Sequence, residues 1–220
     1  MSGDKLTPLQ WRLLEILAGI EPPWTLTGGA ALAGFHLKHR TTKDLDLFWH
    51  GQSQLGNLPQ EIRARLAAAG LDATVLQSGS TFYQLRVRDG QGVCIVDLVA
   101  EPVPPIEPPH RLGIRGISIT VDTPQEILVN KLCALLGRAE IRDLVDVRFL
   151  LGAGADLPQA LADAPRKDAG FSPLTLAWVL RDVRPRALAR VAGLSEAEAD
   201  ELEEFKEQLI STLLETTAPE

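Results

Sequence analysis

This sequence has no long apolar stretch. A membrane-spanning helix needs a run of about 18 or more apolar residues, and none occurs, so we expect no membrane partner. The first ten residues, MSGDKLTPLQ, also lack the basic segment and following apolar segment that mark a secretory signal. The sequence therefore predicts a cytoplasmic protein.

Cysteine is scarce as well. The chain has two, Cys94 and Cys133, and each lies inside an apolar run. Such cysteines are typical of free buried thiols rather than of a disulfide. Two thiols alone do not make a zinc site, which excludes a zinc centre built from cysteine only.

The chain has no excess of positive charge either, since its formal net charge is -7. Residues 193–220 hold nine acidic residues and one basic residue, so the acidic excess lies at the C-terminal end. The rest of the chain is nearly neutral. This balance argues against a broad nucleic-acid-binding surface but leaves the nearly neutral part open to a nucleotide or RNA substrate.

The order of apolar patterns predicts an α+β protein. Periodicity, capping residues and turn signals predict helices at residues 8–19, 30–39 and 59–69, and strands at 24–27, 44–49, 71–76, 81–88, 93–99 and 112–121. Five prolines within residues 101–110 predict an extended connector. Beyond it the pattern becomes helical only. We therefore expect a sheet-containing part at residues 1–121 and a helical part at residues 122–220.

Two aspartates share one face of the strand expected at residues 44–49. Asp44 and Asp46 are two residues apart, which places their stems roughly 6–7 Å apart on the same side of a strand. Leu45 and Leu47 point to the other side. An exposed acidic strand face would account for this pattern, and so would a hard divalent cation with oxygen ligands, such as Mg²⁺.

Gly28 and Gly29 lie between a predicted strand and a predicted helix. Glycine lets the backbone approach a ligand closely, and a helix N-terminus offers free N–H groups to a phosphate. The helix that follows leads directly to Asp44 and Asp46. An anion-binding turn and a cation site are therefore expected on consecutive elements.

A third aspartate, Asp97, interrupts an apolar row formed by Val93, Ile95 and Val99. A carboxylate at such a position is costly unless it is hydrogen-bonded or binds a metal. Structural burial with a backbone partner is one interpretation. The other is a third acid of a phosphoryl-transfer metal centre.

Together these motifs resemble the AbiEii/AbiGii-type nucleotidyltransferases of the DNA polymerase beta-like superfamily. These proteins are the toxins of bacterial toxin–antitoxin and phage-abortive-infection systems. The resemblance rests on LTGGAALAGFHLKHRTTKDLDLFW, on VDLV and on EILVNKLCALLGRAEIRDLVDVRFLL, and it covers residues 24–151. It implies a nucleotidyltransferase fold, with a mixed-sheet core and a helical C-terminal region.

The resemblance also implies roles for the matched residues. Gly28 and Gly29 would hold the triphosphate. Asp44, Asp46 and Asp97 would bind Mg²⁺ or Mn²⁺, and Asp97 would also be the general base.

Further roles fall on basic residues. Arg40 and Lys43, beside the paired aspartates, are candidate phosphate contacts, and so is Arg138. By the resemblance, Lys131 would meet the nucleotide phosphates, and the pair Arg142-Asp143 matches a last family motif. A lysine that lies beside the apolar stripe of its helix and extends to solvent is the alternative for Lys131. Ion pairs along a helix are the alternative for Arg138 and Arg142, and they are the expected arrangement for Arg148.

The function expected from these features is transfer of a nucleoside monophosphate from an NTP to a hydroxyl group of an RNA, such as a tRNA 3′ end, or of a protein. A cognate antitoxin protein is the expected partner. A catalytically silent nucleotidyltransferase-like binding module is the alternative. A metal-dependent phosphohydrolase would share the acids, but the sequence lacks the histidine–aspartate clusters that such enzymes often carry.

Overall fold

The computed structural model describes residues 5–216 of the chain, apart from the side chains at positions 190 and 191. The chain divides into two compact units, which we call the sheet unit (residues 1–123) and the helical unit (residues 124–220). No helix in the described part is long and apolar enough to cross a membrane.

The sheet unit is built on one mixed sheet of seven strands in the order β3-β4-β5-β2-β1-β7-β6. The pairs β2–β5 and β1–β7 are parallel, and the other neighbours are antiparallel. The strands are β1 (Thr25–Thr27), β2 (Asp44–His50), β3 (Asp72–Ser78), β4 (Phe82–Arg88), β5 (Val93–Glu101), β6 (His110–Ile114) and β7 (Ile117–Val121). This mixed sheet confirms the predicted α+β class.

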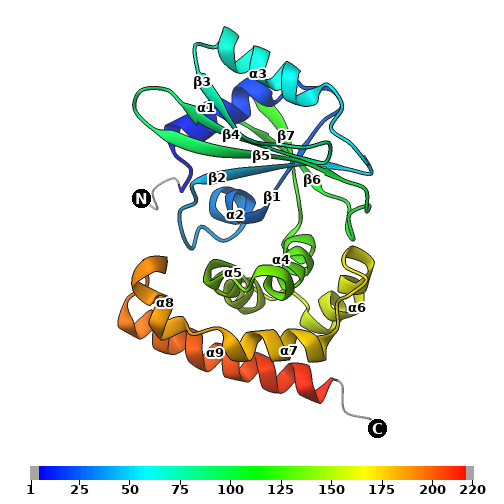
Figure 1. The fold of residues 1–220 in the computed structure, drawn as a ribbon, viewed down its shortest axis with the longest axis vertical. Helices are drawn as coiled ribbons and strands as arrows, with labels where there is room; N and C mark the ends of the chain where they lie inside the picture. The colour runs from blue at the N-terminus through cyan, green and yellow to red at the C-terminus, as the bar shows by residue number, and fades with distance from the viewer. Residues whose placement is uncertain (1–4, 217–220) are drawn as a thin grey trace. The chain divides into compact units, whose positions relative to one another are not determined.

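Helices cover both faces of this sheet. They are α1 (Pro8–Leu17), the short α2 (Gly28–Ala31), the π-helix η1 (Leu32–His36) and α3 (Leu58–Ala68). Helices α1 and α3 lie on one face, and α2 lies on the other, against β1 and β2 (Figure 1). We call the face that carries α2 the acid face, because Asp44 and Asp46 point to it.

Strand β2 alternates strictly between the two faces of the sheet. Leu45, Leu47 and Trp49 are almost completely buried, whereas Asp44 and Asp46 are half-buried. Burial of the three large apolar side chains removes enough apolar surface from water to hold the strand in one register. The apolar side of β2 therefore fixes the direction in which its two carboxylates point.

The start of β2 is also held from α1. Thr7 and Gln10 form a capping box at the N-terminus of α1. The buried side chain of Gln10 also donates a hydrogen bond to the backbone oxygen of Thr42, at 3.2 Å. This bond ties the helix to the segment that leads into Asp44.

Two predicted elements of the sheet unit were wrong in detail. The strand expected at residues 112–121 is a hairpin of β6 and β7. Its turn contains Arg115 with φ 50° and Gly116 with φ 81°, and two positive φ values in succession are typical of a tight β-hairpin turn. The helix expected at residues 30–39 begins at Gly28 and ends at His36, followed by Lys38 with φ 52°.

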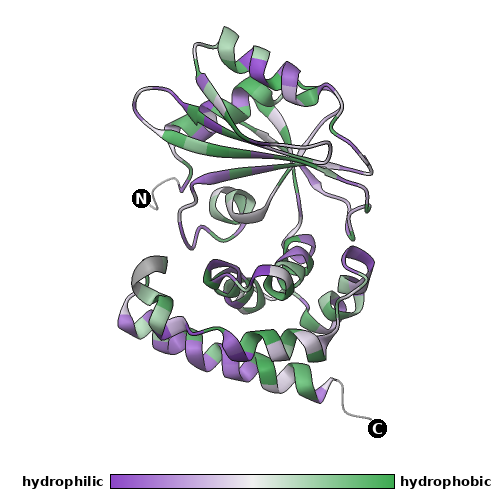
Figure 2. Ribbon diagram, in the orientation of Figure 1, coloured by the Kyte–Doolittle hydropathy of each residue, from purple (hydrophilic) through white to green (hydrophobic). Residues whose placement is uncertain are grey.

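The helical unit consists of helices in its described part. They are α4 (Pro124–Arg138), α5 (Ile141–Gly152), α6 (Leu157–Lys167), α7 (Pro173–Asp182), α8 (Pro185–Ala192) and α9 (Glu196–Glu215). Helix α4 packs against α5, α6 and α7, while α9 packs against α5, α7 and α8. Ser195 and Glu198 form a capping box at the N-terminus of α9. Figure 2 shows that α9 is hydrophilic in its first half and more hydrophobic toward its C-terminal end.

Candidate active site

Asp46 and Asp97 lie directly opposite each other on neighbouring strands of the acid face. They are register partners in the parallel pair β2–β5, and partners in a sheet point to the same face. The same row continues to Thr27 on β1 and to Gln84 on β4. Four polar side chains therefore cross the sheet in one line.

Asp44 adds a third carboxylate to this face, two residues before Asp46. All three acids are half-buried. Their combined charge acts on the thiol of Cys94, whose pKa burial raises to about 12, with further contributions from Asp44, Asp46 and Asp97. The acids thus create one local region of negative charge.

Gly28 stands against the carboxylate of Asp46. Its φ is 61°, and a Cβ atom added to it would lie 2.3 Å from Oδ2 of Asp46. Any side chain at this position would displace that carboxylate. Only glycine combines this backbone conformation with the close approach of the backbone to Asp46.

Gly29 lies close to the side chains of Arg40 and Thr42. A Cβ atom there would lie 3.0 Å from Nη2 of Arg40 and 3.1 Å from Oγ1 of Thr42. The guanidinium group of Arg40 is therefore placed at the start of α2. Lys43 is exposed, and its backbone oxygen accepts a hydrogen bond from the amide of Ile95 at 3.1 Å, which extends the β2–β5 pairing.

The sequence pattern did not point to two residues of this row, Gln84 and Thr27. Gln84 donates a hydrogen bond from Nε2 to Oδ1 of Asp97 at 2.9 Å. The hairpin signal at Asp89-Gly90 could have located Gln84, because that turn sets the β4–β5 register. Thr27 is buried, and within residues 5–216 its Oγ1 has no hydrogen-bond partner. The sequence of the three-residue strand β1 did not indicate that the hydroxyl group of Thr27 is buried without a partner among the described residues.

The donor atoms of this row fit a divalent cation. Carboxylate and hydroxyl oxygens are the ligands that Mg²⁺ and Mn²⁺ prefer. Asp44, Asp46 and Asp97 supply the carboxylates, and the unpartnered Oγ1 of Thr27 is a further oxygen at the same row. Like charges this close are stabilised by a cation between them.

A histidine–aspartate group lies at the end of β7. Asp122 is completely buried, and its Oδ1 lies 3.1 Å from Nε2 of His50. Its backbone oxygen lies 2.8 Å from Nε2 of His36, at the end of η1. Burial lowers the pKa of His36, although its bond to the Asp122 carbonyl acts in the opposite direction. Burial therefore disfavours the charged form of His36.

Lys131 lies in the helical unit, where it bridges two buried aspartates. Its Nζ is 2.7 Å from Oδ1 of Asp143 and 2.9 Å from Oδ2 of Asp146, both on α5. Burial lowers the pKa of Lys131, but the charges of Asp146 and Asp143 outweigh this effect, so its pKa is raised overall. The ammonium group is thus buried and charged, rather than extended to solvent.

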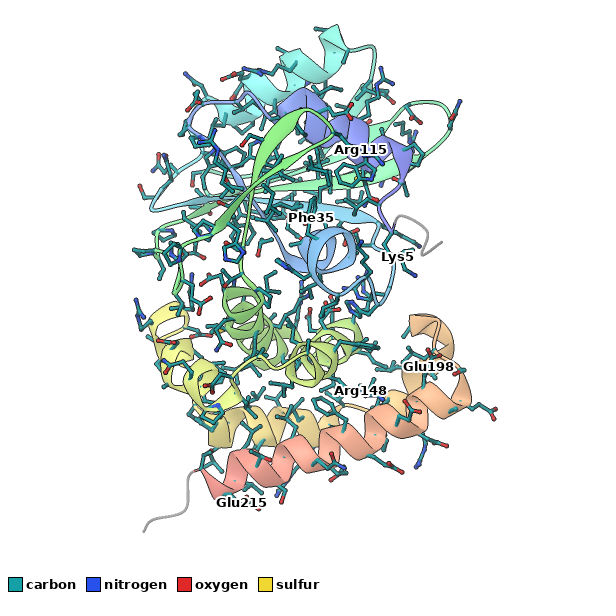
Figure 3. The ribbon with its side chains drawn as sticks, turned by 180° about the vertical axis from the view of Figure 1, so that it is seen from behind. Lys5, Phe35, Arg115, Arg148, Glu198 and Glu215 are labelled. Carbon is teal, nitrogen blue, oxygen red and sulfur yellow. The ribbon has the colours of Figure 1, made fainter. Side chains whose placement is uncertain are left out.

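The arginines near Lys131 have different surroundings. Arg138 binds Asp143 through Nε, at 2.9 Å from Oδ2, and about half of its side chain is exposed. Arg142 is similarly exposed and lies 3.6 Å from Glu140. Arg148 was expected to pair along its own helix, but it reaches Glu201 on α9, at 2.6 Å between Nη2 and Oε2. Figure 3 shows Arg148 pointing from α5 toward α9.

The predicted site residues thus fall into two groups. The sheet unit brings together Gly28, Gly29, Arg40, Asp44, Asp46 and Asp97 on its acid face, with Lys43 at the start of β2. The helical unit brings together Lys131, Arg138 and Asp143, and Arg142, directly before Asp143 in the sequence, lies near Glu140. Each group is compact within its own unit.

Comparison with known protein families gives a match over nearly the whole chain. The model of the family described as nucleotidyl transferase AbiEii toxin, type IV toxin–antitoxin system, matches residues 12–218. No curated protein matches the chain in sequence.

Solved structures show the same fold at low sequence identity. The chain is similar to JHP933 from Helicobacter pylori, with 21% identity, a TM-score of 0.53, and coverage of 95% of this chain and 92% of that one. It is also similar to an H. pylori protein assigned as a nucleotidyltransferase, with 19% identity, a TM-score of 0.55, and coverage of 97% and 100%. The antibiotic-resistance factor ANT(2'')-Ia has 13% identity and a TM-score of 0.51, with coverage of 72% and 91%.

Proposed function

The chain belongs to the AbiEii nucleotidyltransferase toxin family, and on that premise we propose that it transfers a nucleoside monophosphate from an NTP to an acceptor hydroxyl group. The observation that carries this proposal is the register pairing of Asp46 with Asp97 beside Gly28. Two carboxylates beside a backbone turn that admits no side chain suit the binding of a triphosphate and its counter-ion.

Asp44, Asp46 and Asp97 would hold Mg²⁺ or Mn²⁺. A divalent cation supplies charge neutralisation at the phosphates and makes a bound hydroxyl group more acidic. The fixed apolar side of β2 supports this assignment, because a metal site needs carboxylates that do not move when the cation binds.

The nucleotide phosphates would bind at the start of α2. As the first residues of α2, Gly28 and Gly29 have backbone N–H groups without acceptors inside the helix, and Arg40 adds a guanidinium group that lies against Gly29. Lys43 is exposed at the beginning of β2 and would contact the same phosphates. This arrangement would orient the α-phosphate toward the acid face.

Asp97 would act as the general base. Its carboxylate takes the proton of the acceptor hydroxyl while the acceptor oxygen forms a bond to the α-phosphorus. The bond from that phosphorus to the bridging oxygen breaks, and pyrophosphate leaves with the electron pair. Gln84 is a positioning residue in this step, because its amide holds Oδ1 of Asp97 at 2.9 Å.

We also assign nucleotide binding to residues of the helical unit. Lys131 and Arg138 would contribute positive charge to the nucleotide phosphates, and Asp143 would position both of them through its two carboxylate oxygens. Arg142 is about half exposed, which leaves much of its guanidinium group accessible to a ligand. Ion pairs with the buried Asp143 and Asp146 would keep Lys131 charged and in place before the nucleotide binds.

The biological role proposed is that of a growth-inhibiting toxin that modifies an RNA or protein hydroxyl and is neutralised by a cognate antitoxin. The family description, a toxin of a type IV toxin–antitoxin system, supports this role. An NTP is the donor in either case, and the cell interior, where NTPs are abundant, is the proposed location.

The test is incubation of the purified protein with each labelled NTP, Mg²⁺, and total RNA or cell lysate. We expect label in the acceptor and release of pyrophosphate with the wild-type protein. Asp46→Asn should abolish transfer, whereas Asp72→Asn, at an exposed position of edge strand β3, should retain it. Equal transfer by Asp46→Asn and the wild type would contradict the proposed metal site.

A further inference from the structure

Strand β4 extends the acid face beyond Asp97. Gln84 is the register partner of Asp97, and Arg86 is the partner of Ile95, so both side chains point to the acid face. Arg86 is also a diagonal neighbour of Asp97. Such neighbours are roughly 7–8 Å apart, which is within reach of a long side chain.

Arg86 is half-buried, yet it has no partner in the described part of the chain. Within residues 5–216, its guanidinium group makes no hydrogen bond, ion pair or ring contact. Arg65 on α3 is different, since it binds both Glu61 and the backbone oxygen of Gly19. Among the described residues, nothing occupies the donors of Arg86, so they are available to a bound acceptor group, and a partly buried guanidinium group gains most from an anionic one.

The strand order separates the two sides of the acid pair. Gly28 follows β1, Asp46 lies on β2, Asp97 on β5 and Arg86 on β4, and these strands are neighbours in this order. If the nucleotide phosphates bind at Gly28 and Asp46, as the proposed function has it, the acceptor hydroxyl must approach Asp97 from the β4 side. Arg86 stands on that side.

We propose that Arg86 binds a phosphodiester group of a single-stranded RNA acceptor whose terminal hydroxyl group lies at Asp97. This inference rests on the proposed function and names its acceptor class. A planar guanidinium group recognises phosphate oxygens through two parallel hydrogen bonds. Beside Arg86, the acid face carries Ile95 and Val93, and Val93 is 56% exposed. These apolar groups offer contact to a base, whereas a protein acceptor would not need an unpaired cation next to the general base.

The experiment compares Arg86→Gln and Arg86→Lys with a matched control, Arg63→Gln. Arg63 is an exposed arginine on α3, which lies on the opposite face of the sheet (Figure 1). Binding of a fluorescent single-stranded oligoribonucleotide is measured by anisotropy at several salt concentrations. Binding of NTP with Mg²⁺ and transfer of labelled nucleotide to total RNA are measured on the same proteins.

We expect Arg86→Gln to bind the oligoribonucleotide about tenfold more weakly, and the slope of log affinity against log salt to fall by about 0.7, the value for one lost contact to single-stranded nucleic acid. Arg86→Lys should recover part of the affinity because it keeps the charge. Arg63→Gln should match the wild type, and NTP binding should be unchanged in all variants. The KM for RNA should rise in Arg86→Gln.

Three results would overturn the inference: wild-type protein that binds no RNA, Arg86→Gln that binds RNA as the wild type does, or nucleotide transferred only to protein. Failure of the proposed function gives a different pattern. In that case RNA binding still depends on Arg86, but no protein transfers nucleotide and NTP binding does not respond to Mg²⁺ or to Asp46→Asn.

Discussion

Asp46 and Asp97 are register partners on the parallel strands β2 and β5, with their carboxylates on the same face of the sheet. Both aspartates lie within regular strands, not in loops or at strand ends. The opposite face of each strand is buried. A site built on paired strands is held more rigidly than one built on loops, which suits a reaction that depends on the placement of charge.

Replacement of Asp97 by asparagine should remove the general base while keeping the size and hydrogen-bonding shape of the side chain. Loss of a general base typically costs about 10²–10⁴-fold in rate, and we expect a loss within this range in steady-state nucleotide transfer. Thermal unfolding should be almost unchanged. An Asp97→Asn protein with wild-type turnover would show that Asp97 has only a structural role.

Gly28 and Gly70 offer a matched pair for separating backbone strain from damage to the site. Both have positive φ, but only Gly28 faces another group, the carboxylate of Asp46. Gly28→Ala and Gly70→Ala should each lose about 1–2 kcal/mol of unfolding free energy, because alanine is strained in the left-handed region. Only Gly28→Ala should also lose nucleotide transfer. Equal activity of the two variants would argue against a close approach of Gly28 to Asp46.

The buried group of Lys131, Asp143 and Asp146 predicts a strong effect on stability. Lys131→Met removes the ammonium group that bridges two buried carboxylates, and removal of one partner from a buried ion pair costs about 3–5 kcal/mol. Urea denaturation measures this loss. Adding Asp143→Asn and Asp146→Asn should recover part of the stability, since the two buried carboxylates are then neutral and Arg138, which loses its bond to Asp143, is about half exposed to water. No recovery in the triple variant would mean that Lys131 acts mainly through packing.

The raised pKa of Lys131 also sets the direction of its pH dependence. A lysine whose folded-state pKa is raised stabilises the protein fully at neutral pH, and this contribution is lost only as the pH rises through that pKa. Lys131→Met should therefore have a lower unfolding free energy than the wild type near pH 7. In strongly alkaline solution the difference in unfolding free energy between the two proteins should become smaller.

His36 predicts a loss of stability in mild acid. Its folded-state pKa lies below the ordinary value of 6.5, so the unfolded chain binds more protons as the pH falls below that value. Stability is then complete above pH 6.5 and declines at lower pH, by up to about 1.4 kcal/mol for each unit of difference between the two pKa values. His36→Gln, which keeps a donor for the Asp122 carbonyl, should flatten the curve of unfolding free energy between pH 7 and 5. Parallel curves for the two proteins would contradict this assignment.

The sequence predicted which acidic side chains lie on strands better than it predicted the register of those strands. Alternation in DLDLFW showed that Asp44 and Asp46 share a face, and the apolar row around Asp97 placed this residue in a strand. Nothing in one sequence sets the register of β2 against β5, because these parallel strands are joined through α3, β3 and β4. The partner of Asp97 on β4 was accessible in principle, since a short hairpin turn fixes that register.

Other features depended on local conformation or on helix packing. The turn at Arg115-Gly116 splits one expected strand into two, because a non-glycine residue there adopts positive φ. The ion pairs of Lys131 join α4 to α5. Only the packing of these two helices brings the three side chains together, and the periodicity of α4 indicated no more than a lysine beside an apolar stripe.

The long connection between β2 and β5 has a consequence for synthesis of the protein. While the ribosome makes the chain, Asp46 exists before α3, β3, β4 and β5 have been translated. The carboxylate row cannot assemble until the hairpin of β4 and β5 is complete and β5 has joined β2. Under the proposed mechanism, each nascent chain therefore stays inactive until more than one third of the protein has been translated.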